Sequence, residues 1–224
     1  MMMAADDAAL RASISEICRA LAVDASLAQV DDLADFLSLL QKWNATYNLT
    51  AVRDPAQMLV QHLADCLAVI APLRRRLGEL GGATPHRLLD VGSGGGLPGA
   101  VIAIMQPDLD VTCVDTVGKK AAFTRQVAGE LTLRNLHAEH ARVEQLSGSP
   151  FDVITSRAFA SLPDFVSLTR KLLAPDGVWL AMKGKHPEAE IAALPGDVAV
   201  FHVEQLKVPG LDAERCLIWI RPTA

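Results

Sequence analysis

The sequence predicts an α/β fold, in which helices cover a mostly parallel sheet with an antiparallel edge and a helical extension precedes the sheet. Three observations predict it. From residue 87 onward, short apolar runs alternate with helical stretches, which is typical of parallel strands joined by right-handed crossovers. A glycine-rich turn follows the first apolar run. The last two runs are separated only by residues 208–212, so we expect them to pair antiparallel at one edge.

Residues 1–80 are expected to form the helical extension, packed on a main domain of residues 81–224. Ser26 and Gln29 have the spacing of a capping box that opens a second helix. Asp54 before Pro55 is typical of the start of a third helix, and we expect residues 43–53 to form a polar turn between the two. Apolar side chains at helical spacing mark the buried face of the first helix: Leu10, Ile14, Ile17 and Leu21.

In the main domain, apolar runs and turn signals predict the order of strands and helices. We expect strands at residues 87–91, 110–115, 135–140, 151–156, 177–183, 198–206 and 216–221. We expect helices near residues 98–105, 118–131 and 163–173. In such a sheet a ligand binds at the carboxyl ends of the strands, where the strand order reverses.

Composition limits the functional classes. The 224 residues carry a net charge of −5, and the pI of about 5.7 argues mildly against a nucleic-acid binder. No apolar run approaches a membrane span and no signal sequence is evident, so we expect a cytoplasmic protein with no membrane contact, and a monomer. The four cysteines are scattered without a C-x-x-C pair, so we expect buried thiols, no disulfide framework and no metal site.

The turn at residues 92–99 is the most informative segment, because five of its eight residues are glycine. Such a turn lets the backbone approach a ligand closely, and the following helix would direct free N–H groups toward it. Asp115 ends the next strand, about 20 residues beyond the glycines, where an acid is well placed for the ribose hydroxyls of an adenosine cofactor.

Two adenosine cofactors compete for this turn. Residues 94–99 fit G-x-G-x-x-G, the dinucleotide fingerprint, although a glycine-dense loop meets that pattern easily. Asp90, two residues before the first glycine, instead favours a cation. S-adenosylmethionine carries an ammonium and a sulfonium, whereas a carboxylate would repel the pyrophosphate of a dinucleotide. The sequence therefore favours S-adenosylmethionine.

Further polar residues fall at the same edge of the predicted sheet. Glu144 could accept a hydrogen bond from an adenine amino group and Val143 could offer backbone groups, although an exposed glutamate at a helix start is as good an interpretation. Arg157 follows an apolar strand and could clamp a carboxylate or a phosphate, which we favour over an arginine that only caps the strand. Lys183 ends the fifth strand and could meet an RNA phosphate or lie along the surface.

Two pairs in the helical extension have alternative interpretations. His62 and Asp65 share a helix face and could form a catalytic dyad, but a surface pair is the favoured interpretation. Trp43 and Tyr47 could stack a base, but at helical spacing aromatic residues more often belong to the core.

Together these residues resemble the RsmG (GidB) family of bacterial small-subunit ribosomal RNA guanine-N7 methyltransferases. The resemblance runs from about residue 41 to residue 221, with the region before Asp24 matching least. Cys66 stands where the family usually has serine, and Gly95 fills a variable position. The segments that carry the resemblance are Lys42-Trp43-Asn44, residues 48–55, His62-Leu63-Ala64-Asp65, residues 90–99 and Ser156-Arg157-Ala158-Phe159-Ala160.

The resemblance implies a Rossmann-like class I methyltransferase fold, S-adenosylmethionine as cofactor and 16S rRNA of the small ribosomal subunit as partner. The cofactor residues it implies, with those inferred above, are Asp90, Gly92, Gly94, Leu97, Asp115, Val143, Glu144 and Arg157. Asn48, Arg53 and Lys183 are expected to contact the RNA. Guanine N7 has a free lone pair, so no general base is needed and we assign no catalytic residue. A small-molecule methyltransferase, a nicotinamide-dependent reductase and a non-catalytic cofactor- or RNA-binding module stay open as alternatives.

Overall fold

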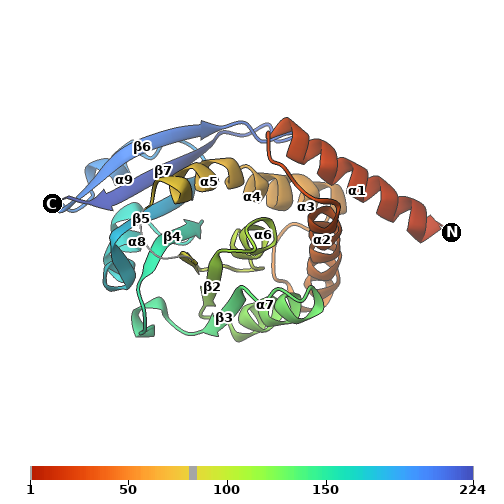
Figure 1. Cartoon of the computed structure of the whole chain (residues 1–224), viewed down its shortest axis with the longest axis horizontal. Helices are drawn as coiled ribbons and strands as arrows, with labels where there is room; N and C mark the ends of the chain where they lie inside the picture. Colours follow the sequence, from red (N-terminus) through yellow and green to blue (C-terminus); the bar gives the residue numbers. More distant parts are fainter. Residues whose placement is uncertain (1, 81–84, 224) are drawn as a thin grey trace.

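The computed structural model describes residues 2–80 and 85–223, and it contains one seven-stranded sheet in the order β3-β2-β1-β4-β5-β7-β6 (Figure 1). The strands β3, β2, β1, β4 and β5 are parallel, β7 pairs antiparallel with β5, and β6 pairs antiparallel with β7. This confirms the predicted mixed sheet. The strands are β1 (Arg87–Val91), β2 (Asp110–Asp115), β3 (Leu136–His140), β4 (Phe151–Arg157), β5 (Leu173–Lys183), β6 (Val198–Leu206) and β7 (Arg215–Pro222).

Helices surround this sheet, and α1 extends away from it to the right of the view, with its inner end beside the loop that joins β6 and β7 (Figure 1). The α-helices are α1 (Met2–Ala20), α2 (Leu27–Tyr47), α3 (Pro55–Met58), α4 (Asp65–Leu67), α5 (Ile70–Glu79), α6 (Gly99–Met105), α7 (Gly118–Glu130), α8 (Leu162–Thr169) and α9 (Glu188–Ala192). A π-helical segment spans Leu59–Ala64, and short 3-10 turns span Val143–Gln145 and Arg170–Leu172.

The strand β5 begins four residues earlier than expected, and the helix before it is correspondingly shorter. Leu173 pairs with Phe151, and the next pair in the register joins Val178 to Val153, so the strand bulges between them. Pro175 lies in this bulge, where a residue without an amide hydrogen costs no ladder bond. The sequence signal missed this extension because Pro175 and Gly177 are typical of a turn.

Alternating side chains from the strands form two hydrophobic cores, one on each face of the sheet. On one face, Leu88 packs in the same cluster as Ile14 and Phe36 of the N-terminal helices. On the other face, Leu89 packs in a cluster with Phe165 of α8. The helical extension therefore shares a core with the sheet. The predicted boundary between the helical extension and the main domain falls at residues 81–84, which lie outside the described residues.

The turn after α2 is shorter than expected, because residues 43–47 continue the helix to Tyr47. Asn48 ends the helix in the left-handed conformation, with φ 50° and ψ 58°. Buried Asn44 then fastens the turn: its Nδ2 donates to the Val52 carbonyl (3.0 Å) and its Oδ1 accepts from the Thr50 amide (2.8 Å). The turn is thus held rigidly against its own helix.

The helical run Pro55–Glu79 corrects one expectation from composition. Its 25 residues contain a window of mean hydropathy 1.4, long and apolar enough to cross a membrane. Within the fold, 67% of that window is buried. Leu63, Leu67 and Ile70 are fully enclosed in the first core, so packing inside the protein accounts for the apolar composition.

All four cysteines are buried and free, as expected for small apolar side chains. Across residues 2–80 and 85–223, no group of three or more His, Cys, Asp or Glu side chains is arranged to hold a metal ion.

We expect Ser26→Ala to destabilise the protein by about 1 kcal/mol, because it removes the cap of α2. Ser26 Oγ accepts from the Gln29 amide (3.2 Å), and Gln29 Oε1 accepts from the Ser26 amide (2.9 Å). Urea denaturation would measure the loss. Ser38→Ala is the matched control, because Ser38 lies inside the same helix and alanine is favoured there. Equal stabilities of the two variants would contradict the prediction.

Candidate functional site

Two adjoining hollows lie at the carboxyl ends of the parallel strands, where the strand order reverses between β1 and β4. Their volumes are about 580 and 330 Å³, and they share Gly92, Lys120 and Ala158. We call the larger one the first lobe and the smaller one the second lobe. The first lobe is lined by Thr50, His62, Asp65, Gly94, Leu97, Arg157, Lys183 and Arg215, among others. The second is lined by Asp115, Thr116, Val117, Ala141, Val143, Glu144 and Phe159, among others.

The glycine turn needs glycine for two different reasons. Gly92 has φ +68°, and a Cβ there would lie 2.7 Å from the ring of Phe159. Gly99 begins α6, and a Cβ there would overlap Cys113 Sγ and approach Asp90 Oδ2 to 2.9 Å. The first glycine therefore shapes the turn, and the second allows α6 to start directly against β1 and β2.

Asp90 lies beneath this turn and lines neither lobe. Its side chain is fully buried, and Oδ2 accepts a hydrogen bond from the Gly99 amide (2.8 Å), while Oδ1 has no partner. Burial raises the pKa of Asp90 to about 7, although the Gly99 amide and Arg157 both act to lower it. The structure thus makes Asp90 an anchor of the turn. Its contact with a cofactor stays a prediction, for which Oδ1 is the unused atom.

Asp115 faces the second lobe and also fixes the glycine turn. Oδ2 accepts from the Gly94 amide (3.0 Å), and Oδ1 accepts from the Val117 amide (2.8 Å). The ammonium of Lys120 lies 3.8 Å from Oδ2. Because a carboxylate offers about four acceptor positions, Asp115 keeps acceptor capacity for two hydroxyl groups in the lobe.

The other cofactor residues expected from the sequence divide between the lobes. Gly92, Gly94 and Leu97 line the first lobe, and Gly92 also borders the second. Val143 and Glu144 line the second lobe from the 3-10 turn after β3, and Val143 is buried there. The structure therefore brings these residues and Asp115 around one continuous cleft.

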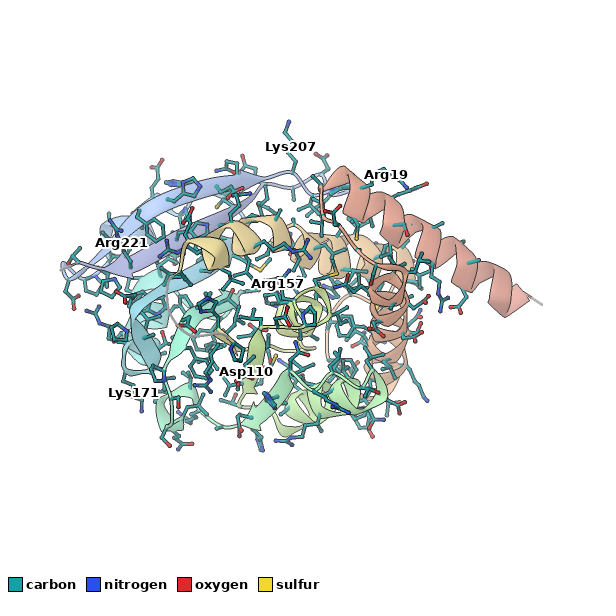
Figure 2. All side chains as sticks on the ribbon, in the orientation of Figure 1. Arg19, Asp110, Arg157, Lys171, Lys207 and Arg221 are labelled. Atoms are coloured by element: carbon teal, nitrogen blue, oxygen red, sulfur yellow. The ribbon has the colours of Figure 1, made fainter. Side chains whose placement is uncertain are left out.

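A buried carboxylate joins two arginines at the wall of the first lobe. Arg157 Nη1 donates to Asp65 Oδ2 (3.1 Å) and to the Gln61 carbonyl (3.0 Å), and Arg215 Nε donates to Asp65 Oδ1 (2.8 Å). Asp65 is only 2% exposed. In Figure 2, Arg157 lies in the interior of the view, whereas Lys171, Lys207 and Arg221 lie at its margin. Asp65 therefore ties α4 to the ends of β4 and β7.

His62 is also buried, so the favoured interpretation of His62 and Asp65 as a surface pair is wrong. The helical run is buried in the core, and this face of it turns toward the cleft. His62 Nε2 lies 2.7 Å from Thr50 Oγ1, and Nδ1 lies 3.5 Å from Arg157 Nη2. Burial, and then the charge of Arg157, lower the pKa of His62 to about 4, so the ring is neutral at neutral pH.

The residues expected to contact RNA differ in their surroundings. Lys183 lines the first lobe, but its ammonium is paired, 2.8 Å from Glu190 Oε2 and 3.1 Å from the Ala160 carbonyl. Arg53 donates to Asn48 Oδ1 (2.8 Å) on the exposed turn whose next residues, Leu49 and Thr50, line the first lobe. Lys183 therefore lies in the cleft, and Asn48 and Arg53 lie on the adjoining turn.

Comparison with known proteins identifies the family of this chain. Residues 29–218 match the family model GidB, rRNA small subunit methyltransferase G. The chain belongs to this family. The match begins upstream of residue 41, so it includes most of α2 as well.

Curated relatives of this methyltransferase G family are similar over nearly the whole chain. A protein of Acidovorax ebreus (strain TPSY), named ribosomal RNA small subunit methyltransferase G, is 61% identical and both chains are covered completely. One of the same name from Leptothrix cholodnii (strain ATCC 51168 / LMG 8142 / SP-6) is 65% identical, covering 91% of this chain and 92% of its own.

Solved structures confirm the predicted Rossmann-like class I methyltransferase fold. Magnesium protoporphyrin IX methyltransferase of Synechocystis PCC 6803, solved with bound SAM, has a TM-score of 0.59 at 18% identity and covers 84% of this chain and 97% of its own. TrmN from Thermus thermophilus has a TM-score of 0.56 at 21% identity and covers 70% of this chain and 49% of its own.

Sequence reasoning missed two residues of this site. Asn44 was recognised only as part of a motif, although it holds the turn that borders the first lobe. Arg215 was not singled out at all. The signal was present, because antiparallel pairing of β7 with β5 places the start of β7 beside Lys183, at the carboxyl ends of the parallel strands.

Removing the carboxylate of Asp65 should strongly destabilise the protein. Asp65→Ala leaves two arginines facing each other without a counter-ion, and we expect a loss of about 2 to 4 kcal/mol. Asp31→Ala is the matched control, because it breaks an exposed pair with Arg11 and should cost at most about 1 kcal/mol. Urea denaturation measures both, and similar losses in the two variants would argue against a structural role for Asp65.

The buried carboxyl of Asp90 should make stability depend on pH. Its pKa rises from 3.8 to about 7 on folding, so the folded state binds the proton more tightly and stability falls as pH rises between those values. Asp90→Asn cannot titrate. We therefore expect the variant to gain stability relative to the unchanged protein as pH rises from about 5 to 8. Denaturation at several pH values measures the difference, and parallel curves would refute the assignment.

Proposed function

We propose that this protein transfers a methyl group from S-adenosylmethionine to N7 of a guanine in the 16S rRNA of the small ribosomal subunit, in the cytoplasm. The observation that carries the proposal is the two-lobed cleft at the switch point of the sheet, in a chain of the small-subunit rRNA methyltransferase G family. That the protein acts as a monomer stays a prediction.

The second lobe fits the adenosine part of the cofactor. Asp115 keeps acceptor capacity for the ribose hydroxyls, and Val143 and Glu144 border the space beyond it. Gly92 lines both lobes, so the rest of the cofactor can extend from the second lobe past Gly92 toward Arg157 in the first lobe. When bound, S-adenosylmethionine supplies an electrophilic methyl carbon on a positively charged sulfur.

The first lobe fits the acceptor base. Lys120, Arg157, Lys183 and Arg215 line it, and the acids that pair with them are Asp115, Asp65 and Glu190. Because Arg157 and Arg215 share the single carboxylate of Asp65, this group keeps a small positive excess in an otherwise acidic chain. Such charge attracts RNA phosphates locally, despite the net charge of −5. The bulk charge favours an assembled small subunit, with protein contacts, over naked RNA, and predicts weak, salt-sensitive binding to stripped RNA.

The polar groups of the first lobe support a reaction without a general base. Neutral guanine N7 attacks through its own lone pair, so no proton must be removed before methyl transfer. His62 is held between Thr50 and Arg157, and both oxygens of Asp65 accept from arginines. These side chains are therefore suited to fixing the wall of the cleft, and the chain contributes proximity and alignment.

Methyl transfer from labelled S-adenosylmethionine tests the proposal. Small subunits and stripped small-subunit RNA from cells lacking this protein are offered in parallel, and N7-specific strand scission locates the label. We expect label at one guanine N7 and preference for the subunit. Label at another atom, or on a small molecule only, would overturn the proposed acceptor.

The ribose contact is tested by Asp115→Asn against Asp110→Asn at the other end of the same strand. Losing the carboxylate should raise the KM for S-adenosylmethionine about tenfold, because charged hydrogen bonds to the ribose are lost. Asp110 pairs with Arg87 and His137 away from the cleft, so its variant should keep an unchanged KM. An unaffected KM in Asp115→Asn would overturn the placement of adenosine in the second lobe.

A further inference from the structure

An exposed aromatic ring lies three residues before Thr50, a residue that lines the first lobe. Tyr47 is the only tyrosine of the chain and the last residue of α2, and it is 44% exposed. Its ring centroid lies 5.0 Å from that of Trp43, which in turn meets the ring of Phe123 edge-on at 5.5 Å. The sequence favoured a core position for both Trp43 and Tyr47. This is correct for Trp43, which packs against the core beside Phe123, and wrong for Tyr47, which extends the aromatic stack to the surface.

The position of this ring is fixed relative to the first lobe. Asn44 fastens the turn after Tyr47 through two hydrogen bonds, and Thr50 on that turn lines the first lobe. Three residues of chain span at most about 11 Å, so the backbone of Tyr47 lies within that distance of Thr50. A nucleotide next to one seated in the lobe can therefore reach the ring.

Two cationic side chains contact the backbone of Tyr47 and the side chain of the next residue, Asn48. Lys119 Nζ donates to the Tyr47 carbonyl (2.6 Å), and Arg53 donates to Asn48, the next residue along the chain. Lys120, adjacent to Lys119, lines both lobes. An aromatic face with neighbouring cations is the combination that binds single-stranded nucleic acid, because bases stack on the ring and phosphates meet the charges.

We propose that Tyr47 stacks on an RNA base that flanks the target nucleotide, while Arg53 and Lys119 contact the adjoining phosphates. The inference rests on the proposed function, since it takes RNA as the substrate. It adds a specific contact. A target base must leave its stack to enter the first lobe, and Tyr47, supported from behind by Trp43, offers the neighbouring base a replacement surface.

The test compares Tyr47→Ala with Tyr47→Phe. Phenylalanine keeps the ring, so it should behave like the unchanged protein. Alanine should weaken equilibrium binding of small subunits and of stripped RNA, and raise the KM for subunits, each by about fivefold or more. The kcat and the affinity for S-adenosylmethionine should stay within about twofold. Leu27→Ala is the matched control, because Leu27 is 84% exposed at the other end of α2.

Several results would overturn the inference. Unchanged RNA binding by a Tyr47→Ala variant with normal thermal unfolding would exclude stacking. Equal defects in the Phe and Ala variants would assign the effect to the hydroxyl. A defect with intact subunits but not with stripped RNA would identify a protein contact. The binding measurements do not depend on methyl transfer. If the unchanged protein does not methylate guanine N7, the proposed function fails, but the RNA affinity of the Tyr47→Ala variant still tests the stacking contact.

Discussion

The buried carboxylate of Asp65 is the constraint on which the cleft depends. Three segments far apart in the sequence meet there: the helical run through His62 and Asp65, the end of β4 through Arg157, and the start of β7 through Arg215. Two guanidinium groups at one wall would repel each other without a shared counter-ion. Because Asp65 supplies it, both guanidinium groups can line the cleft in an otherwise acidic chain.

The strands and the glycine turn could be predicted because each signal is local. β1, β2 and β6 have the expected bounds, and the caps at Ser26 and Asp54 are present. The network around Asp65 could not be predicted, since its partner Arg215 lies 150 residues away along the chain. Helical spacing placed His62 and Asp65 on one face correctly, but it could not reveal that this face is buried. The bulge of β5 was missed because Pro175 imitates a turn.

Both predicted acids at the strand ends hold the backbone of the glycine turn. Asp90 accepts from Gly99, and Asp115 accepts from Gly94 and Val117. The two acids differ in the surroundings of their remaining acceptor positions. Asp115 is open to the second lobe, whereas Asp90 is sealed below the turn with one oxygen unpartnered. Burial therefore separates these two strand-end carboxylates into a group open to the second lobe and an internal anchor.

The antiparallel placement of β7 also determines when the site can exist during synthesis. Its first residue, Arg215, stands beside Lys183 at the cleft, so the wall of the first lobe combines residues from Leu49 to Arg215. A ribosome releases the chain from its amino end, and the glycine turn, the helical run and β4 emerge well before β7. Until β7 joins the sheet, Asp65 has only Arg157 to pair with. The wall of the first lobe thus stays incomplete in the nascent protein until nearly all of the described chain has left the ribosome.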